Sequence, residues 1–190
     1  AFAIYDLEKK CLFAARDRYG LKPFYYAHYN GLFVFGSEAR AFYEAGLVPF
    51  EPKQEHFNEF LIFGYVAGKE TLHKHIYELE PGHYLVYADN EIKIVKYYTY
   101  PGEKTEFEPV NEDGIIDELE NKIKNSVALW LAADVRIGTL LSGGIDSSLI
   151  TRFAGDYLKD LQTFTVYFPD DPGWDERNFS RKRKRYTYSI

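Results

Sequence analysis

Cysteine is almost absent from this sequence, since Cys11 is the only one among 190 residues. A single cysteine excludes an internal disulfide and a cysteine-built metal cluster, and it fits a reducing cytoplasmic compartment. Secretory and membrane signals are also missing. The longest apolar run, Val127 to Ala133, is far short of the roughly 20 residues that a membrane span needs. We therefore expect a soluble cytoplasmic protein with no membrane partner.

Positive charge is scarce outside the C-terminal tail. The chain has 29 acidic and 23 basic side chains and a formal net charge of −6, which argues against a nucleic-acid partner. A basic run follows Arg177, and we interpret it as a solvated tail rather than a phosphate contact. Of the histidines, only His73 and His75 lie close together in sequence, without a carboxylate cluster. The sequence thus predicts no zinc site.

Two patterns of secondary structure divide the chain. Residues 1–100 contain short aromatic and β-branched runs separated by turns, which predict antiparallel strands, with helices expected at 38–45 and 54–63. Residues 101–114 are rich in proline, glycine and acidic side chains and predict a connector. Residues 115–190 follow the order helix, strand, helix, strand, which is typical of a parallel α/β sheet. Because the chain opens inside a strand-like alternation without methionine, we expect a piece of a longer protein.

The stretch "LLSGGIDSSLI", Leu140 to Ile150, joins a predicted strand at 136–141 to a predicted helix. Backbone N–H groups at a helix N-terminus lack intrahelical partners and the dipole there favours anions, so a phosphate is the expected ligand. Gly143 and Gly144 allow close approach of the backbone, and three serines add hydroxyl donors, namely Ser142, Ser147 and Ser148. The stretch has no lysine and therefore is not a Walker A loop.

Asp146 needs a separate explanation, because a carboxylate beside a phosphate is repelled by it. Two interpretations stay open from the residues alone. Asp146 caps the following helix by accepting a backbone N–H bond, or it contacts a magnesium ion held between the protein and the phosphates.

Several stretches resemble one enzyme family in family order. "SGGIDSS" resembles the pyrophosphate loop of the ATP pyrophosphatase superfamily. "FAIYD", "ARDRYGLKPFYY" and "GSEARAF" resemble the later part of the class II glutaminase domain of glutamine-dependent asparagine synthetases. "TLHKHIYELEPGHYL", "ADVRIGTLLSGGIDSSLI" and "TFTVYF" resemble the segment that leads into the synthetase domain and the start of that domain. The resemblance extends to about Asn178.

This resemblance implies a fold and a set of site residues. The fold would be the end of an α+β glutaminase domain of the Ntn type, rich in antiparallel strands, over residues 1–100. The start of an α/β parallel-sheet domain like the adenine-nucleotide hydrolases would follow over 115–190. Leu140 and Val166 would contact the adenosine end of ATP, and Asp146 would also contact magnesium. The residues expected to hold the ATP phosphates are Ser142, Gly143, Gly144, Asp146, Ser147 and Ser148.

The implied reaction is an ATP-dependent amide ligation. Aspartate is adenylated on its side-chain carboxylate with release of pyrophosphate, and ammonia from glutamine then attacks the acyl-adenylate to give asparagine and AMP. The implied ligands are ATP, magnesium, aspartate and glutamine, and the full-length protein is expected to form a homodimer.

The sequence departs from the family at its first residue, which is Ala1 where the family has a nucleophilic cysteine. Cys11 lies in an alternating stretch that is typical of a packed thiol, so no catalytic residue is assigned and the chain alone is expected to be inactive. Two alternatives remain. One is a related amidotransferase that acts on another carboxylate or closes a lactam ring, and the other is a non-catalytic nucleotide-binding module.

Overall fold

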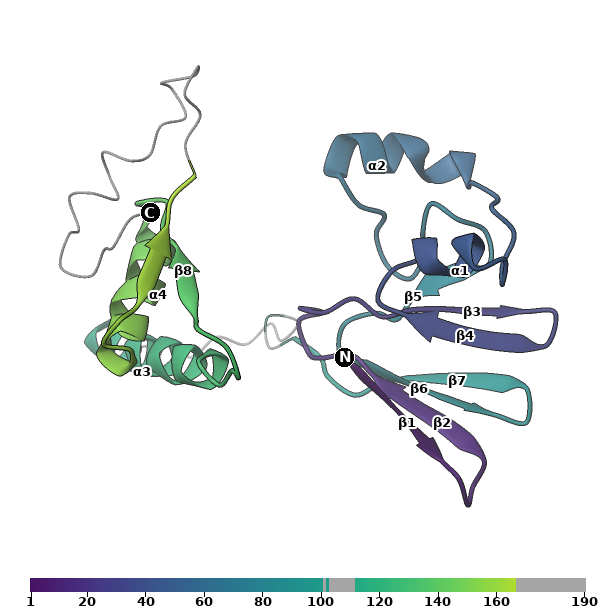
Figure 1. The fold of residues 1–190 in the computed structure, drawn as a ribbon, viewed down its shortest axis with the longest axis horizontal. Coiled ribbons are helices and arrows are strands. Elements are labelled where there is room, and N and C mark those ends of the chain that lie inside the picture. The colour runs from purple at the N-terminus through teal and green to yellow at the C-terminus, as the bar shows by residue number, and fades with distance from the viewer. Residues whose placement is uncertain (101, 103–111, 167–190) are drawn as a thin grey trace. The chain divides into compact units, whose positions relative to one another are not determined.

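A computed structural model of the chain describes residues 1–100, 102 and 112–166 (Figure 1). The chain divides into two compact units, Ala1–Glu106 and Phe107–Ile190. The basic tail that the sequence analysis interprets lies outside the described residues. Within residues 1–100 and 112–166, no helix combines the length and the apolar character needed to cross a bilayer.

The first unit contains two antiparallel sheets. The four-stranded sheet has the order β1-β2-β6-β7, with bounds Phe2–Asp6, Cys11–Ala15, His83–Ala88 and Glu91–Lys96. The three-stranded sheet has the order β4-β3-β5, with bounds Leu32–Gly36, Tyr25–Tyr29 and Ile76–Glu78. The prediction of antiparallel strands in this half of the chain is confirmed.

Strand β3 separates two hydrophobic cores, because successive side chains of a strand point to opposite faces. Tyr26 belongs to the core between the two sheets, together with Ala14 of β2 and Leu85 of β6. Its neighbour Ala27 belongs to a second core with Phe42. Because Tyr26 points to one face and Tyr25, Ala27 and Tyr29 point to the other, this one strand contributes to both cores.

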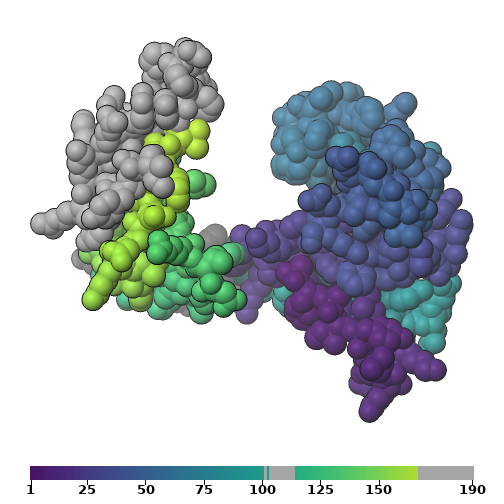
Figure 2. All heavy atoms as spheres, viewed as in Figure 1, coloured from purple at the N-terminus to yellow at the C-terminus, as the bar shows by residue number. Residues whose placement is uncertain are grey.

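Helix α1 (Arg40–Glu44) covers the second core, and α2 (Phe57–Phe63) contributes no buried residue to it. Helix α1 supplies Phe42, and a 3₁₀ turn (Gln54–His56) leads directly into α2. These elements confirm the two predicted helices. In the space-filling view, the atoms of α1 and α2 gather on the side of the first unit away from β1 and β2 (Figure 2).

The second unit is a small α/β arrangement. Its elements are α3 (Glu112–Trp130), β8 (Gly138–Leu140), α4 (Ile145–Tyr157) and β9 (Gln162–Phe164). Strands β8 and β9 pair in parallel, which confirms the predicted sheet type. Side chains of both helices form a core with the residue before β9, through Val127, Phe153 and Leu161.

Element boundaries differ from the prediction in this unit. Helix α3 begins at Glu112, inside the stretch predicted as a connector, because its acidic start favours the positive end of a helix and extends it before the first apolar residue. Strand β8 covers three of the six residues predicted at 136–141, since pairing with β9 is limited to its register.

Arg16 joins separate parts of the first unit. Its side chain is 7% exposed and its guanidinium donates hydrogen bonds to the carbonyl oxygens of Lys22 (3.0 Å), Gly20 (3.0 Å) and Leu79 (2.7 Å). The same group forms an ion pair with Glu78 at 2.8 Å. Removing a buried charge that satisfies this many acceptors leaves them all unpaired.

We expect Arg16→Met to lower the free energy of unfolding of the first unit by about 3 to 5 kcal/mol, because Glu78 would remain without its buried partner. Urea unfolding followed by near-ultraviolet circular dichroism of the tyrosines measures this. The matched control is Arg40→Met, whose exposed pair with Glu44 should contribute under about 1 kcal/mol. Equal losses in the two variants would contradict the role given to Arg16.

Stability should also depend on the protonation of Asp17. Partial burial acts to raise the pKa of Asp17, but backbone N–H groups of Leu21, Lys22 and Tyr19 donate to its carboxylate and hold the pKa below its usual value. The folded state therefore gains stability from the ionised group above the unfolded pKa of about 3.9, and loses it as the pH falls through the lower folded pKa. Comparing acid unfolding of the protein with that of Asp17→Asn checks this, because the variant should lose part of the pH dependence in that window.

Candidate functional site

The candidate site is the turn between β8 and α4. Because β8 and β9 are parallel, this turn lies at the carboxyl end of the sheet, where ligands of α/β proteins bind. Gly143 has a φ of +85°, in the region that favours glycine, and it lets the chain reverse before the helix. Gly144 is the N-cap residue of α4, and no side chain caps the helix there.

Backbone donors converge at the start of α4. Among the described residues, no hydrogen bond engages the N–H groups of Gly143, Ile145, Asp146 and Ser147, whereas the N–H of Ser148 donates to the Gly144 carbonyl at 3.1 Å. These free groups lie at the positive end of a 13-residue helix. The turn is therefore built to accept an anion.

Two serine hydroxyls, those of Ser142 and Ser147, form a hydrogen bond across the opening of the turn, which we call its mouth. The Oγ atoms of Ser142 and Ser147 lie 2.9 Å apart, and the N–H of Gly144 donates to Ser142 Oγ at 3.3 Å. Hydroxyl groups can rotate toward an anion, so these two side chains can turn from each other to an incoming phosphate.

Ser148 differs from the other two serines. It is 5% exposed, and its hydroxyl donates to the Gly144 carbonyl at 2.5 Å. In this position the hydroxyl holds the first turn of α4 together rather than facing the mouth of the loop.

Asp146 lies in the first turn of α4, with its side chain exposed. The interpretation of Asp146 as a helix cap is wrong, because the N-cap is Gly144 and no side-chain hydrogen bond caps the helix. A carboxylate free at this point fits one ligand of a magnesium ion, which typically binds one or two carboxylates together with phosphate oxygens. Among the residues that the structure describes, no group of three His, Cys, Asp or Glu side chains forms a complete metal cage.

Leu140 ends β8 and pairs with Phe164, and Val166 lies two residues beyond the end of β9. Leu140 is 73% exposed and Val166 is 64% exposed, so both apolar side chains are open to a ligand near the carboxyl ends of the strands.

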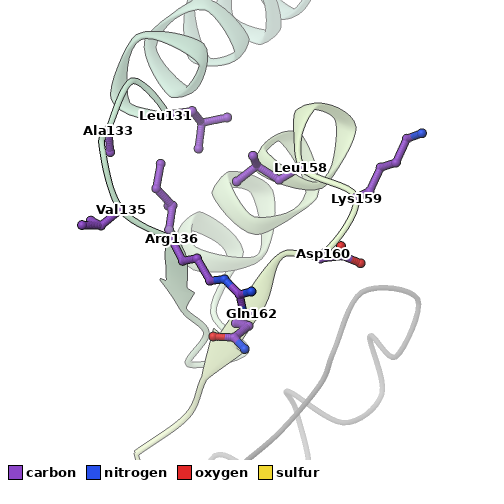
Figure 3. Close-up of a pocket in the computed structure, with 9 residues that line it drawn as sticks. Leu131, Ala133, Val135, Arg136, Leu158, Lys159, Asp160 and Gln162 are labelled. Atoms are coloured by element: carbon purple, nitrogen blue, oxygen red, sulfur yellow. The ribbon is translucent and has the colours of Figure 1, made fainter.

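Two cavities are lined by described residues of the second unit. One of about 710 Å³ is bordered by Leu140 and Ser147 of the site and by apolar side chains such as Trp130 and Ile150; Val166 does not line it. Another, of about 580 Å³, lies at the opposite end of the strands and is lined by Arg136, Leu158 and their neighbours (Figure 3). None of the predicted site residues lines this second cavity, so it is separate from the turn.

Three threonines support the turn, and the sequence analysis did not single them out. Thr151 of α4 donates to Thr139 of β8 at 3.0 Å, and Thr165 donates to the Leu141 carbonyl at 2.8 Å. Their signal in the sequence is weak, because alternating threonines are common on strands for reasons of propensity alone.

Comparison with known proteins agrees with the order of the two units. Residues 1–98 match the family model for the glutamine amidotransferase domain, and residues 118–187 match that for asparagine synthase. The chain belongs to the glutamine amidotransferase domain family. Its second matched segment, of the asparagine synthase family, contains the whole turn from Leu140 to Ile150.

Relatives match nearly the whole chain. Asparagine synthetase (glutamine-hydrolyzing) 1 of Bacillus subtilis is 33% identical over 95% of this chain and 27% of its own length. Asparagine synthetase (glutamine-hydrolyzing) 3 of the same organism is 31% identical over 90% of this chain and 28% of its own length. Amidase chyE of Penicillium rubens is 30% identical over 96% of this chain and 29% of its own length. The chain thus spans less than a third of the length of these relatives.

We expect Gly143→Ala to destabilise the second unit by about 1 to 2 kcal/mol, because a Cβ is strained at this positive φ. Urea unfolding followed by tryptophan fluorescence measures it, since Trp130 at the end of α3 belongs to this unit. The matched control is Gly114→Ala in α3, where a Cβ meets open space and should stabilise by about 0.5 to 1 kcal/mol. Shifts of the same sign in both variants would contradict this account of the turn.

Proposed function

We propose that this chain carries the pyrophosphate-binding loop of an ATP-dependent amide ligase that converts aspartate to asparagine with glutamine-derived ammonia. The observation that carries the proposal is the cluster of unpaired N–H groups and two serine hydroxyls at the carboxyl end of a parallel sheet. The match of residues 118–187 to the asparagine synthase family supports it.

The loop acts on the leaving group of the first step. A carboxylate oxygen of the acceptor attacks the α-phosphorus of ATP, and the bond from that phosphorus to the bridging oxygen breaks, so that pyrophosphate carries the charge away. The N–H groups of Gly143, Ile145 and Asp146 and the nearby hydroxyls hold that charge. Each hydrogen bond to a charged group contributes about 1.5 to 3 kcal/mol. In the second step, the ammonia nitrogen attacks the acyl carbon and AMP leaves.

Asp146 is the residue proposed to hold magnesium. When bound, the ion neutralises phosphate charge and orients the pyrophosphate oxygens. The carboxylate of Asp146 lies at the start of α4, on the same turn as Ser147. Without an ion, the Asp146 carboxylate would repel the phosphates. With magnesium bound, the same carboxylate would be a ligand of the ion that accompanies them.

Leu140 and Val166 are proposed to contact the adenosine end of the nucleotide. Both side chains are exposed, Leu140 at the end of β8 and Val166 two residues after the end of β9. Exposed apolar side chains beside an anion-binding turn suit a ligand with a flat base at one end and phosphates at the other.

The first unit is proposed to be part of an Ntn-type glutaminase domain, comprising residues 1–100 and linked by residues 101–114 to the synthetase part. The two stacked antiparallel sheets and the family match over residues 1–98 support this assignment. No described residue is given a role in glutamine hydrolysis, and we propose that the chain by itself binds nucleotide without completing the reaction.

A second candidate is the same chemistry on another carboxylate. It is favoured by the similarity to a relative named amidase chyE, whose identity to this chain is close to that of the named asparagine synthetases. The turn handles only the nucleotide and does not discriminate between the two acceptors.

We expect calorimetry to detect binding of ATP and of inorganic pyrophosphate, each with magnesium, to this chain. Gly144→Asp should abolish both, because a Cβ at Gly144 already lies 3.3 Å from Ser142 Oγ and a carboxylate there would enter the anion site. Asp146→Asn should weaken ATP binding about tenfold with magnesium, the equivalent of 1.4 kcal/mol, and change it little or strengthen it without magnesium.

The matched control is Asp160→Asn, which removes the same charge beside the cavity at the other end of the strands and should leave binding unchanged (Figure 3). Absence of binding to the unsubstituted chain, or binding that Gly144→Asp does not affect, would refute the proposed function.

A further inference from the structure

Leu141, the residue that enters the turn, is held twice by the end of β9. Its N–H donates to the Phe164 carbonyl at 2.8 Å, and its carbonyl accepts a hydrogen bond from Thr165 Oγ1 at 2.8 Å. The side chain of Leu141 is 3% exposed. Both polar groups of this residue are therefore fixed toward one neighbouring strand at the point where the strand ends.

Fixing the Leu141 carbonyl also fixes the first donor of the turn. In a trans peptide the C=O of one residue and the N–H of the next point in opposite directions. Because the Leu141 carbonyl points toward Thr165, the N–H of Ser142 points away from β9, and it donates a hydrogen bond to Ser147 Oγ at 3.3 Å. A reversed peptide at this position would place a carbonyl oxygen where an anion is expected.

A second hydroxyl holds the other side of the turn. The hydroxyl of Thr151, which is 5% exposed, donates to the hydroxyl of Thr139. This hydrogen bond joins α4 to β8 one to two helical turns after the free N–H groups. With α4 fixed in this way, the orientation of the Leu141–Ser142 peptide depends on the Thr165 hydroxyl and the strand bond to Phe164.

We propose that Thr165 is a positioning residue for phosphate binding: its hydroxyl fixes the Leu141–Ser142 peptide so that the Ser142 N–H faces the anion. Thr165 itself does not contact the phosphate. This inference rests on the proposed function of the turn. It adds a requirement for a hydroxyl at the end of the neighbouring strand, outside the "SGGIDSS" stretch.

The test uses three variants of the chain, with inorganic pyrophosphate and magnesium together as the probe. Thr165→Val has nearly the same shape and removes the hydroxyl, Thr165→Ser keeps the hydroxyl, and Thr163→Val makes the same change at the buried threonine two residues earlier. Calorimetry gives the affinity for pyrophosphate, and the ¹H–¹⁵N spectrum gives the environment of the Ser142 amide without any ligand.

We expect Thr165→Val to weaken pyrophosphate binding about five- to tenfold, the size of effect expected for one lost hydrogen bond. The Ser142 amide signal should shift in the same variant. Thr165→Ser should restore affinity to within about twofold of the unsubstituted chain, and Thr163→Val should leave affinity and the Ser142 signal unchanged.

Different outcomes overturn different claims. If the unsubstituted chain binds pyrophosphate and Thr165→Val binds it equally well, the positioning role is wrong and the proposed function stands. If Thr165→Ser or Thr163→Val loses as much affinity as Thr165→Val, the effect is one of packing and the positioning role is again wrong. If the unsubstituted chain does not bind pyrophosphate, the proposed function fails and the positioning role with it.

Discussion

The parallel pairing of β8 with β9 is the constraint on which the candidate site depends. Only three residue pairs form it, from Gly138 with Gln162 to Leu140 with Phe164. Because this register brings the ends of both strands level, Leu141 meets the end of β9 at the point where the chain turns toward α4. So short a ladder gains further support from the core of Val127, Phe153 and Leu161, which holds both helices against the strands. The anion-binding geometry is thus a consequence of packing as much as of the glycines.

The first unit depends on Arg16 in the way that the candidate site depends on the pairing of β8 with β9. The stretch around it, "ARDRYGLKP", is polar enough to suggest catalytic charges, yet its arginine is buried and its hydrogen bonds go to three backbone carbonyls. The next residue, Asp17, accepts from backbone N–H groups of the same loop. Together the two side chains satisfy a loop that has few backbone partners of its own, which gives the charged residues at the end of strand β2 a structural role.

Local patterns predicted the elements well and their ends poorly. Alternation in "HYLVYA" and the paired positive φ values at Asp89 and Asn90 correspond to a hairpin that the sequence indicates directly. The start of α3 was predicted too late, because acidic residues read equally well as a connector and as a helix N-terminus. A strand end depends on where its partner ends, so the length of β8 could not be read from its own residues.

In the candidate site too, features set by local sequence were predictable and features set by distant partners were not. The glycines, the exposed serines and the strand-to-helix context of the turn were predictable, because each follows from local backbone chemistry. The hydrogen bond from the Ser148 hydroxyl to the Gly144 carbonyl was not predictable, because it depends on the helical geometry that brings the two groups together. Thr165 is 24 residues from Leu141 in sequence, and only the sheet register brings its hydroxyl to that carbonyl. Contacts of this kind carry no local pattern.

Charge decides what the turn can bind by itself. Residues 140–150 contain no lysine, arginine or histidine, and Asp146 adds a negative charge at the helix start. The dipole of α4 corresponds to about half a positive charge, and neutral N–H and hydroxyl donors add hydrogen bonds but no net charge. Against a pyrophosphate group of several negative charges, this is a deficit that hydrogen bonding alone does not offset. A divalent cation held by the Asp146 carboxylate would supply the missing positive charge and would reduce the repulsion between that carboxylate and the phosphates. The proposed function of the turn therefore combines two parts: the neutral donors would select the shape of a pyrophosphate group, and the proposed ion at Asp146 would supply the positive charge.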